Sequence, residues 1–147
     1  AAQKRVLAGL ARNPALQGRV ARLTVPRGIG IVTALPWALE VDDPHRFSSI
    51  SRAVSYCGLC AAEEESDGKR SRRRSQRSYR FNPSLRTTLI EAAKLAPRHN
   101  TQLAEVHARA LERTKSDNLA TIAVARKLVA WLLAIDKRKE DFVALPN

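Results

Sequence analysis

The sequence has few cysteines, few aromatic residues, few acidic residues and no methionine, and these shortages limit what the chain does. Because methionine is absent, we expect the chain to be a processed, trimmed or incomplete product. The two cysteines, Cys57 and Cys60, form a single CGLC with no second pair at metal-ligand spacing. We therefore predict neither a zinc site nor a redox centre there, but two small residues at the end of a helix.

A long uninterrupted apolar run is also lacking. The most apolar stretch, LATIAVARKLVAWLLAI at residues 119–135, contains Arg126 and Lys127, which are costly in a bilayer but comfortable on the flank of a helix. No signal peptide is evident. We predict a cytoplasmic protein with no membrane partner.

What the chain does have is an ordinary globular balance and a large excess of positive charge. Its 147 residues are 44% hydrophobic and 27% charged, which predicts one domain, residues 1–147, with its own core. Twenty-six Lys and Arg against fourteen Asp and Glu leave a formal charge of +12. Such a charge favours polyanionic partners, above all nucleic acid.

Apolar residues recur at helical spacing in most of the chain, and alternating β-branched runs are rare. The fold class predicted is therefore all-α. The expected helical segments are 1–23 (broken at Asn13 and Pro14), 31–41, 47–59, a segment begun by Pro83 and Ser84, a segment capped by Asn100, and 118–137. Two sets of residues are expected to be buried, namely Phe47, Ile50, Val54 and Leu59, and Leu103, Val106, Ala110 and Leu111. Helical spacing also links the early set Val6, Leu7, Leu10, Leu16, Val20 and Leu23, and the residues Leu85, Leu89, Ala92 and Ala96 share one helix face.

A glycine turn, PRGIG, precedes the segment 31–41 and resembles a helix-hairpin-helix element. In such an element Gly28 and Gly30 would let the backbone approach a phosphate, which the free N–H groups at the helix start would bind. The same pattern is also typical of a compact turn, so both interpretations stay open.

A long basic loop or arm is predicted between residues 61 and 83, where apolar periodicity is absent. Seven basic residues fall within it, followed by Phe81, which with Tyr79 is suited to stacking or packing. They are Lys69, Arg70, Arg72, Arg73, Arg74, Arg77 and Arg80. We favour nucleic-acid contact for this run over a solvated loop.

Two other features of this loop bear on chemistry. Glu63, Glu64 and Glu65 are adjacent carboxylates, which we expect to be solvated rather than to hold a metal. Ser66 is a hydroxyl beside strong positive charge, and such a hydroxyl can attack a phosphodiester, although most loop serines do no chemistry.

Five blocks in order carry a family resemblance: LTVPRGIGIVTAL, DDPHRFSSISRAVSYCGL, SDGKRSRRRS, NPSLRTTLIEAA and NLATIAVARKLVAWLLAI. Together they cover about residues 19–135. They resemble the C-terminal domain of the IS110/IS116/IS902 family of transposases, a group that includes pilin-gene invertases and bridge-RNA-guided recombinases.

The resemblance implies a DNA transposase or recombinase whose serine joins transiently to DNA. By position the serine is Ser66, and Lys69 is the lysine of the same block. Asn82, Leu85 and Arg86 match an Asn-x-x-Leu-Arg block, and Arg126 with Lys127 match a late basic pair. Three positions depart from the family pattern, namely the inserted Arg27, Asp67 in place of glycine, and Phe81 in place of glycine.

The resemblance further implies an N-terminal RuvC-like domain that binds a divalent metal such as Mg²⁺, and we expect that domain to be absent from this sequence. No cofactor is expected in this chain. The expected partners are DNA, a guide RNA in some members, and further copies of the full-length protein. The residues expected to bind nucleic acid are Gly28, Gly30, Lys69, Arg70, Arg72, Arg73, Arg74, Arg77, Arg80, Asn82 and Arg86.

Three functions remain open from the sequence. The first is DNA binding and strand transfer by a transposase with Ser66 as nucleophile. The second is a catalytically inactive remnant that only binds DNA, and the third is a small basic RNA-binding protein.

Overall fold

A computed structural model describes residues 2–60 and 81–138, and within these ranges the chain forms helices and no strand. The all-α prediction is confirmed. In chain order the elements are α1 (Ala2–Ala11), α2 (Pro14–Leu23), α3 (Ile31–Val41), the short 3-10 helix η1 (Pro44–Arg46), α4 (Ile50–Tyr56), α6 (Pro83–Leu95), the 3-10 helix η4 (Ala96–Arg98), α7 (Thr101–Thr114) and α8 (Asp117–Arg138).

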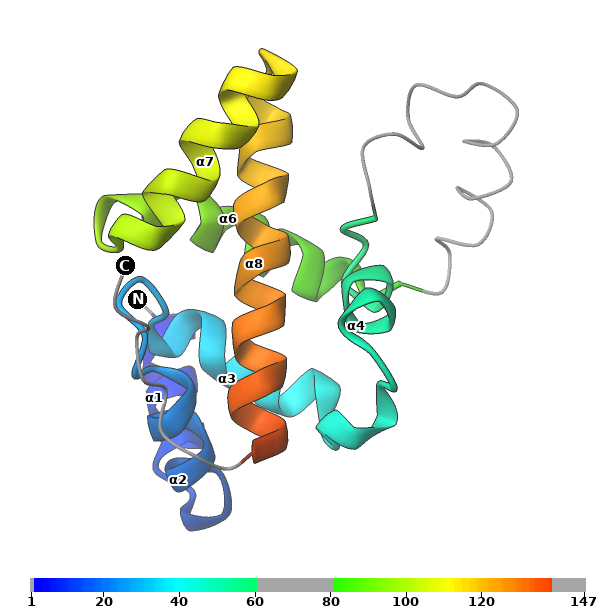
Figure 1. The fold of residues 1–147 in the computed structure, drawn as a ribbon. Coiled ribbons are helices and arrows are strands. Elements are labelled where there is room, and N and C mark those ends of the chain that lie inside the picture. The colour runs from blue at the N-terminus through cyan, green and yellow to red at the C-terminus, as the bar shows by residue number, and fades with distance from the viewer. Residues whose placement is uncertain (1, 61–80, 139–147) are drawn as a thin grey trace.

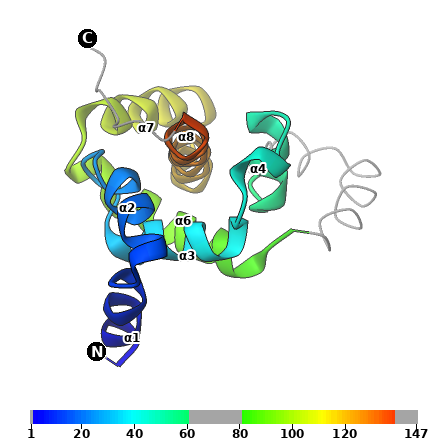
Figure 2. The ribbon, with the colours of Figure 1, turned by 90° about the horizontal axis from the view of Figure 1, so that it is seen from below.

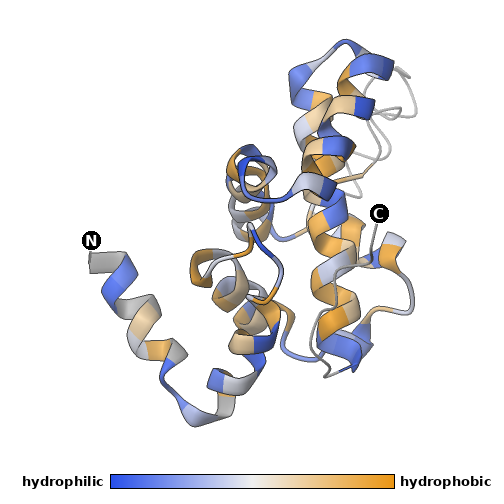
Figure 3. Cartoon of the chain, turned by 60° about the vertical axis from the view of Figure 1, so that its left-hand side comes forward, coloured by the Kyte–Doolittle hydropathy of each residue, from blue (hydrophilic) through white to orange (hydrophobic). Residues whose placement is uncertain are grey.

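Helix α8 is the central element, and the other helices are arranged around it (Figure 1). It packs against α2, α4, α6, α7 and η1. Its buried side chains include Val124, Leu128 and Leu132, which no solvent reaches. By length and composition α8 could cross a membrane. Its packing inside this domain explains the same apolar run, and Figure 3 shows hydrophobic residues concentrated along it.

The helix starts follow from side chains that accept hydrogen bonds from otherwise unpaired backbone N–H groups. Asn82 caps α6, of which Pro83 is the first residue, and Asn100 caps α7 by accepting from the N–H groups of Gln102 and Leu103. The predicted starts of both helices are confirmed. The break between α1 and α2 at Asn13 is confirmed as well.

A buried ionic cluster joins α2, α3 and α8, and nothing in the sequence pattern indicated it. The Arg19 guanidinium donates from Nε to Oδ1 of Asp136 and from one terminal nitrogen to Oδ2, both at 2.8 Å. Trp37 donates from Nε1 to the same Oδ2 at 3.0 Å. Because Asp136 and Trp37 are buried, this cluster fixes how α8 lies against α2 and α3.

Two of the residues expected in the core are exposed instead. Ile50 is the first residue of α4 and is 50% exposed, and Leu111 in the last turn of α7 is 38% exposed. The predicted burial is confirmed at Phe47, Val54, Leu103 and Ala110. The two errors lie near helix ends, where fewer neighbouring elements cover the face that periodicity marks as apolar.

The two cysteines lie at the end of α4, as predicted. Cys57 is the C-cap residue and is buried, and Cys60 is partly buried beyond it; neither is in a disulfide. Burial raises the pKa of the Cys57 thiol to about 12. Cys57 is therefore a protonated, unreactive thiol at neutral pH.

Helix α1 lies at the edge of the fold. It contacts α2 and α3, and Figure 2 shows it extending away from the other helices toward the N-terminus. Lys4 and Arg5 on this helix are exposed.

Candidate nucleic-acid interface

The glycine turn is docked on the corner between α6 and α7. Gly28 has a φ of +99°, and a Cβ added to it would lie 3.0 Å from Cβ of Ala96. The turn is tied down further because Asn100 donates from Nδ2 to the carbonyl oxygen of Arg27 at 3.0 Å. Gly28 is therefore required by the close approach of two segments of the protein itself.

Gly30 differs from Gly28. It is the N-cap residue of α3, its backbone is extended, and a Cβ added to it would meet nothing within 4 Å. The start of α3 is therefore open on that side. Phosphate binding there, and the helix-hairpin-helix interpretation of the turn, stay predictions.

The structure gives Asn82 several protein partners. Its Oδ1 accepts from the N–H of Leu85 at 3.0 Å, and its Nδ2 donates to Oε2 of Glu40 at 2.9 Å and to the Tyr56 hydroxyl at 3.3 Å. Its own N–H donates to the Tyr56 carbonyl at 2.7 Å. These bonds tie the start of α6 to α3 and α4, which is reason enough for an asparagine at this position.

Arg86 also has a partner within the protein. It donates from Nε to the carbonyl oxygen of Gly58 at 3.2 Å. Gly58 has a φ of +69°, and a Cβ added there would lie 2.6 Å from the Phe81 ring. Phe81, which departs from the family pattern, thus lies directly on the turn after α4. Contact of Asn82 and Arg86 with nucleic acid stays a prediction.

The predicted nucleophile and most of the predicted basic contacts lie outside the described residues. These are Ser66, Lys69, Arg70, Arg72, Arg73, Arg74, Arg77 and Arg80. Both chain segments that flank residues 61–80 are placed, however. Leu59 donates from its N–H to the Val54 carbonyl, and Asn82 donates to the Tyr56 carbonyl, so both flanks lie at the end of α4.

A groove lies beside this end of α4, and we call it the α4–α8 groove. Its volume is about 520 Å³. One wall is α4, the other is α8, and Val106 of α7 and Cys60 complete the lining. The residues from α4 are Ile50, Ser51, Val54 and Ser55. Those from α8 are Ala123, Arg126, Lys127 and Ala130.

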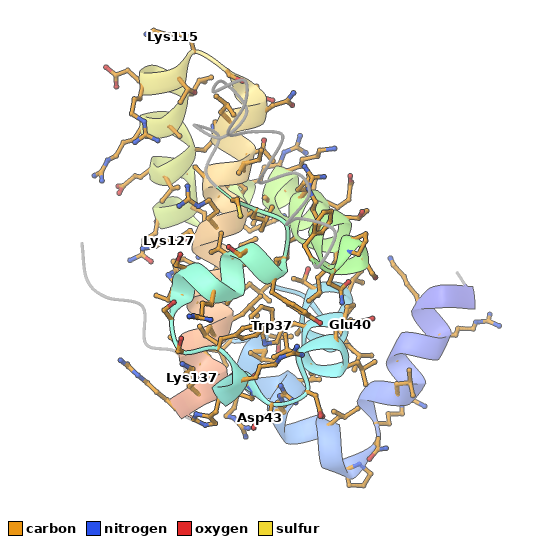
Figure 4. All side chains as sticks on the ribbon, turned by 90° about the vertical axis from the view of Figure 1, so that its right-hand side faces the viewer. Trp37, Glu40, Asp43, Lys115, Lys127 and Lys137 are labelled. Atoms are coloured by element: carbon orange, nitrogen blue, oxygen red, sulfur yellow. The ribbon has the colours of Figure 1, made fainter. Side chains whose placement is uncertain are left out.

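The groove exists because of what each helix presents to the other. The α8 residues that line it recur at i, i+3, i+4 and i+7, so they form one stripe along the helix. Ala123 and Ala130 are small and leave space, while Arg126 and Lys127 are exposed between them. α8 passes behind α4 in Figure 4, with Lys127 labelled near its middle.

The α4 wall is held against α8 by the segment before it. Lys137 near the end of α8 donates from Nζ to the carbonyl oxygen of Phe47 at 2.6 Å. Phe47 is buried, and its ring lies 5.2 Å from that of Tyr56, centroid to centroid. The guanidinium of Arg46 lies 4.7 Å from the Tyr56 ring centroid and 5.3 Å from that of Phe47.

The two cations of the groove have no partner among residues 2–60 and 81–138. Arg126 and Lys127 form no hydrogen bond or ion pair there, in contrast to Arg19, Arg86 and Lys137. An exposed cation pair that the protein does not neutralise is available to an anion. The sequence hinted at this pair, because two charges interrupt an otherwise apolar helix, but it did not show the groove.

The described part of the chain offers no metal centre. Within it, no group of three or more His, Cys, Asp or Glu side chains is placed to hold an ion. Glu63, Glu64 and Glu65 lie outside the described residues.

Fold and groove together define a small, strongly basic, all-helical protein with a cationic groove at the end of α4. Its sequence matches the family described as Transposase IS116/IS110/IS902 over residues 20–108, which is more than half of the chain. The protein therefore belongs to this family of transposases, and membership implies interaction with DNA. Comparison with curated proteins and with solved structures found no match.

Proposed function

We propose that this chain is the DNA-binding and strand-transfer part of an insertion-sequence transposase, in which the Ser66 hydroxyl attacks a DNA phosphodiester. Membership of the transposase family is the observation that carries the proposal, and Ser66 lies inside the matched range 20–108. The formal charge of +12 supports it, because DNA is the polyanion on which transposases act.

The proposed reaction is a phosphoryl transfer to serine. A base removes the Ser66 proton, the oxygen forms a bond to phosphorus, and the bond from phosphorus to the leaving sugar oxygen breaks. That oxygen takes up a proton, and the strand end remains linked to serine until a sugar hydroxyl attacks in turn and releases the serine. Lys69 and the arginines that follow it would stabilise the charge of the pentacoordinate transition state.

The placement of the flanking residues supports this assignment. Residues 61–80 begin directly after Cys60, which lines the α4–α8 groove, and end at Phe81, which lies against Gly58. Ser66 is six residues from Cys60, a distance of at most about 20 Å in a fully extended chain. The groove cations and the proposed nucleophile are therefore within reach of the same DNA strand.

In this proposal the metal-bearing RuvC-like domain of the full-length protein would activate Ser66, so this chain alone would not complete the reaction. The family resemblance leads us to expect Mg²⁺ in a RuvC-like domain, and the described residues hold no carboxylate group that fits such an ion. We further propose self-association of the full-length protein and, as in some related recombinases, a guide RNA as a partner.

The test is to trap the covalent intermediate. The chain is combined with a RuvC-like domain of the family and Mg²⁺ and incubated with a nicked or suicide DNA substrate, and a DNA adduct is sought on a denaturing gel and mapped by mass spectrometry. We expect an adduct at Ser66 that is lost in Ser66→Ala and kept in Ser71→Ala, a control serine from the same basic run. An adduct that survives Ser66→Ala overturns the assignment of the nucleophile.

The same experiment separates the alternatives. DNA binding that depends on salt, without any adduct, identifies a chain that only binds DNA and overturns the strand-transfer assignment. Equal affinity for structured RNA and duplex DNA favours the RNA-binding alternative and counts against the whole proposal.

A further inference from the structure

The α4–α8 groove combines two features that a flat basic surface lacks. Its rim carries Arg126 and Lys127, which have no partner among the described residues. Its floor is largely apolar, built from residues such as Val54, Val106 and Ala123. A ligand that fits both features has an anionic group at one end and an apolar face at the other.

The volume of the groove also limits the ligand. About 520 Å³ is the size of a pocket for one small-molecule-sized group. A DNA duplex is too wide to enter it, whereas a single unpaired nucleotide has suitable dimensions. Its phosphate would lie at Arg126 and Lys127, and its sugar and base would lie on the apolar floor, beside Ser51 and Ser55 of the α4 wall.

We propose that the α4–α8 groove binds one unpaired nucleotide of a single DNA strand, with the phosphate held by Arg126 and Lys127. The choice of DNA rests on the proposed function, while the presence of a nucleotide site rests on the groove itself. Both cations lie beyond the matched residues 20–108, and the family resemblance marks them only as a late basic pair with no ligand assigned.

Cys60 gives this site a built-in reporter. The chain has two cysteines, and Cys57 is buried with its thiol pKa raised to about 12, so thiol reagents at neutral pH should react with Cys60 alone. Because Cys60 lines the groove, a bound nucleotide should shield it.

The experiment measures the rate of Cys60 alkylation in the full chain by mass spectrometry, with poly-dT, poly-rU or duplex DNA added. Poly-dT should slow the reaction, and duplex DNA at the same phosphate concentration should slow it much less. Equal protection by the duplex, or stronger protection by poly-rU than by poly-dT, would overturn the assignment to an unpaired DNA nucleotide.

Charge variants identify the phosphate contacts. Arg126→Gln with Lys127→Gln should lower the affinity for poly-dT about tenfold near physiological salt, because two phosphate contacts are lost from a single strand. Lys4→Gln with Arg5→Gln is the matched control, since it also removes one exposed Lys and one exposed Arg that are adjacent on a helix. Equal losses in both double variants would show that only total charge matters.

A filling variant separates the groove from its charges. Ala130→Leu places a larger side chain in the groove and leaves both cations intact, whereas Ala134→Leu makes the same change at an exposed position on the same helix. Circular dichroism checks that both variants remain folded. We expect Ala130→Leu to abolish the protection of Cys60 by poly-dT, and unchanged protection would overturn the proposal.

Failure of the groove assignment can be told apart from failure of the function proposed above. A chain that binds no DNA at all contradicts both proposals. A chain that forms the Ser66 adduct while Arg126→Gln with Lys127→Gln behaves like its control contradicts only the groove assignment.

Discussion

Removing the carboxylate of Asp136 should destabilise the protein strongly, because side chains from three helices meet at this residue. In Asp136→Ala the Arg19 guanidinium and the Trp37 N–H lose the acceptor that they share. The side chains of Arg19 and Asp136 are only 16% and 2% exposed, so water cannot easily replace the lost partner.

The magnitude follows from what is left unpaired. Breaking a buried ion pair from one side costs about 3–5 kcal/mol, and the partial exposure of Arg19 places this pair near the lower end, about 3 kcal/mol. For a chain of this size such a loss lowers the melting temperature by about 10 °C. Asp136→Asn, which keeps one acceptor oxygen, should cost less, about 2 kcal/mol.

The assay is urea and thermal unfolding followed by circular dichroism. Glu112→Gln, which removes an exposed carboxylate on α7, is the control and should change stability by less than about 0.5 kcal/mol. In a double-mutant cycle, Arg19→Ala should cost clearly less when Asp136 is already alanine. A loss in Asp136→Ala as small as that of the control, or fully additive single losses, would refute the reasoning.

Four further substitutions test how turns and caps hold the fold. Gly28→Ala should lower the free energy of unfolding in urea by about 2 kcal/mol, because its φ is unfavourable for alanine and the added Cβ would meet Ala96. Gly30→Ala should cost less than about 1 kcal/mol, and equal losses in the two variants would contradict this. Asn82→Ala should cost about 1–2 kcal/mol by losing the cap of α6, and a loss of DNA affinity without a loss of stability would instead make Asn82 a DNA contact. Lys115→Gly should raise the melting temperature, because Lys115 has a φ of 59° at the end of α7, and should stabilise by about 1 kcal/mol; an unchanged or lower melting temperature would contradict this.

Much of the fold could be predicted because each helix carries its own boundary signals. Asn100 is followed by apolar residues at helical spacing, and Pro83 follows a capping asparagine, so both starts were visible in the sequence. Local periodicity also identified the buried faces, except at Ile50 and Leu111, where the number of covering neighbours decides. That number depends on tertiary packing, which a window of sequence does not contain.

The tertiary contacts of single polar residues could not be predicted. Arg19 and Asp136 are 117 positions apart, and no local pattern links them. From its sequence Gly28 fitted both a phosphate contact and a compact turn, and no local pattern predicted that it would lie against Ala96.

The candidate site was predicted only in part. The sequence identified the basic run between residues 61 and 83 as a candidate site. A run of charged residues has no apolar periodicity, so its conformation cannot be predicted from the sequence. The α4–α8 groove forms where two helix faces meet. The alanines that leave space for it do not stand out in the sequence, because alanine is common in helices. Of the groove residues, only Arg126 and Lys127 could be noticed in the sequence. Two charged residues in the middle of an apolar helix indicate a side of that helix that faces outward.

The most direct test of DNA handling by this chain is the salt dependence of its affinity for duplex DNA, measured by fluorescence anisotropy with two unrelated sequences. If the seven basic residues between Lys69 and Arg80 meet phosphates, log K should fall with log salt at a slope of about −6, with little difference between the sequences. Absence of binding at low salt, or a slope near zero, would contradict the proposal that this protein binds the phosphate backbone of DNA.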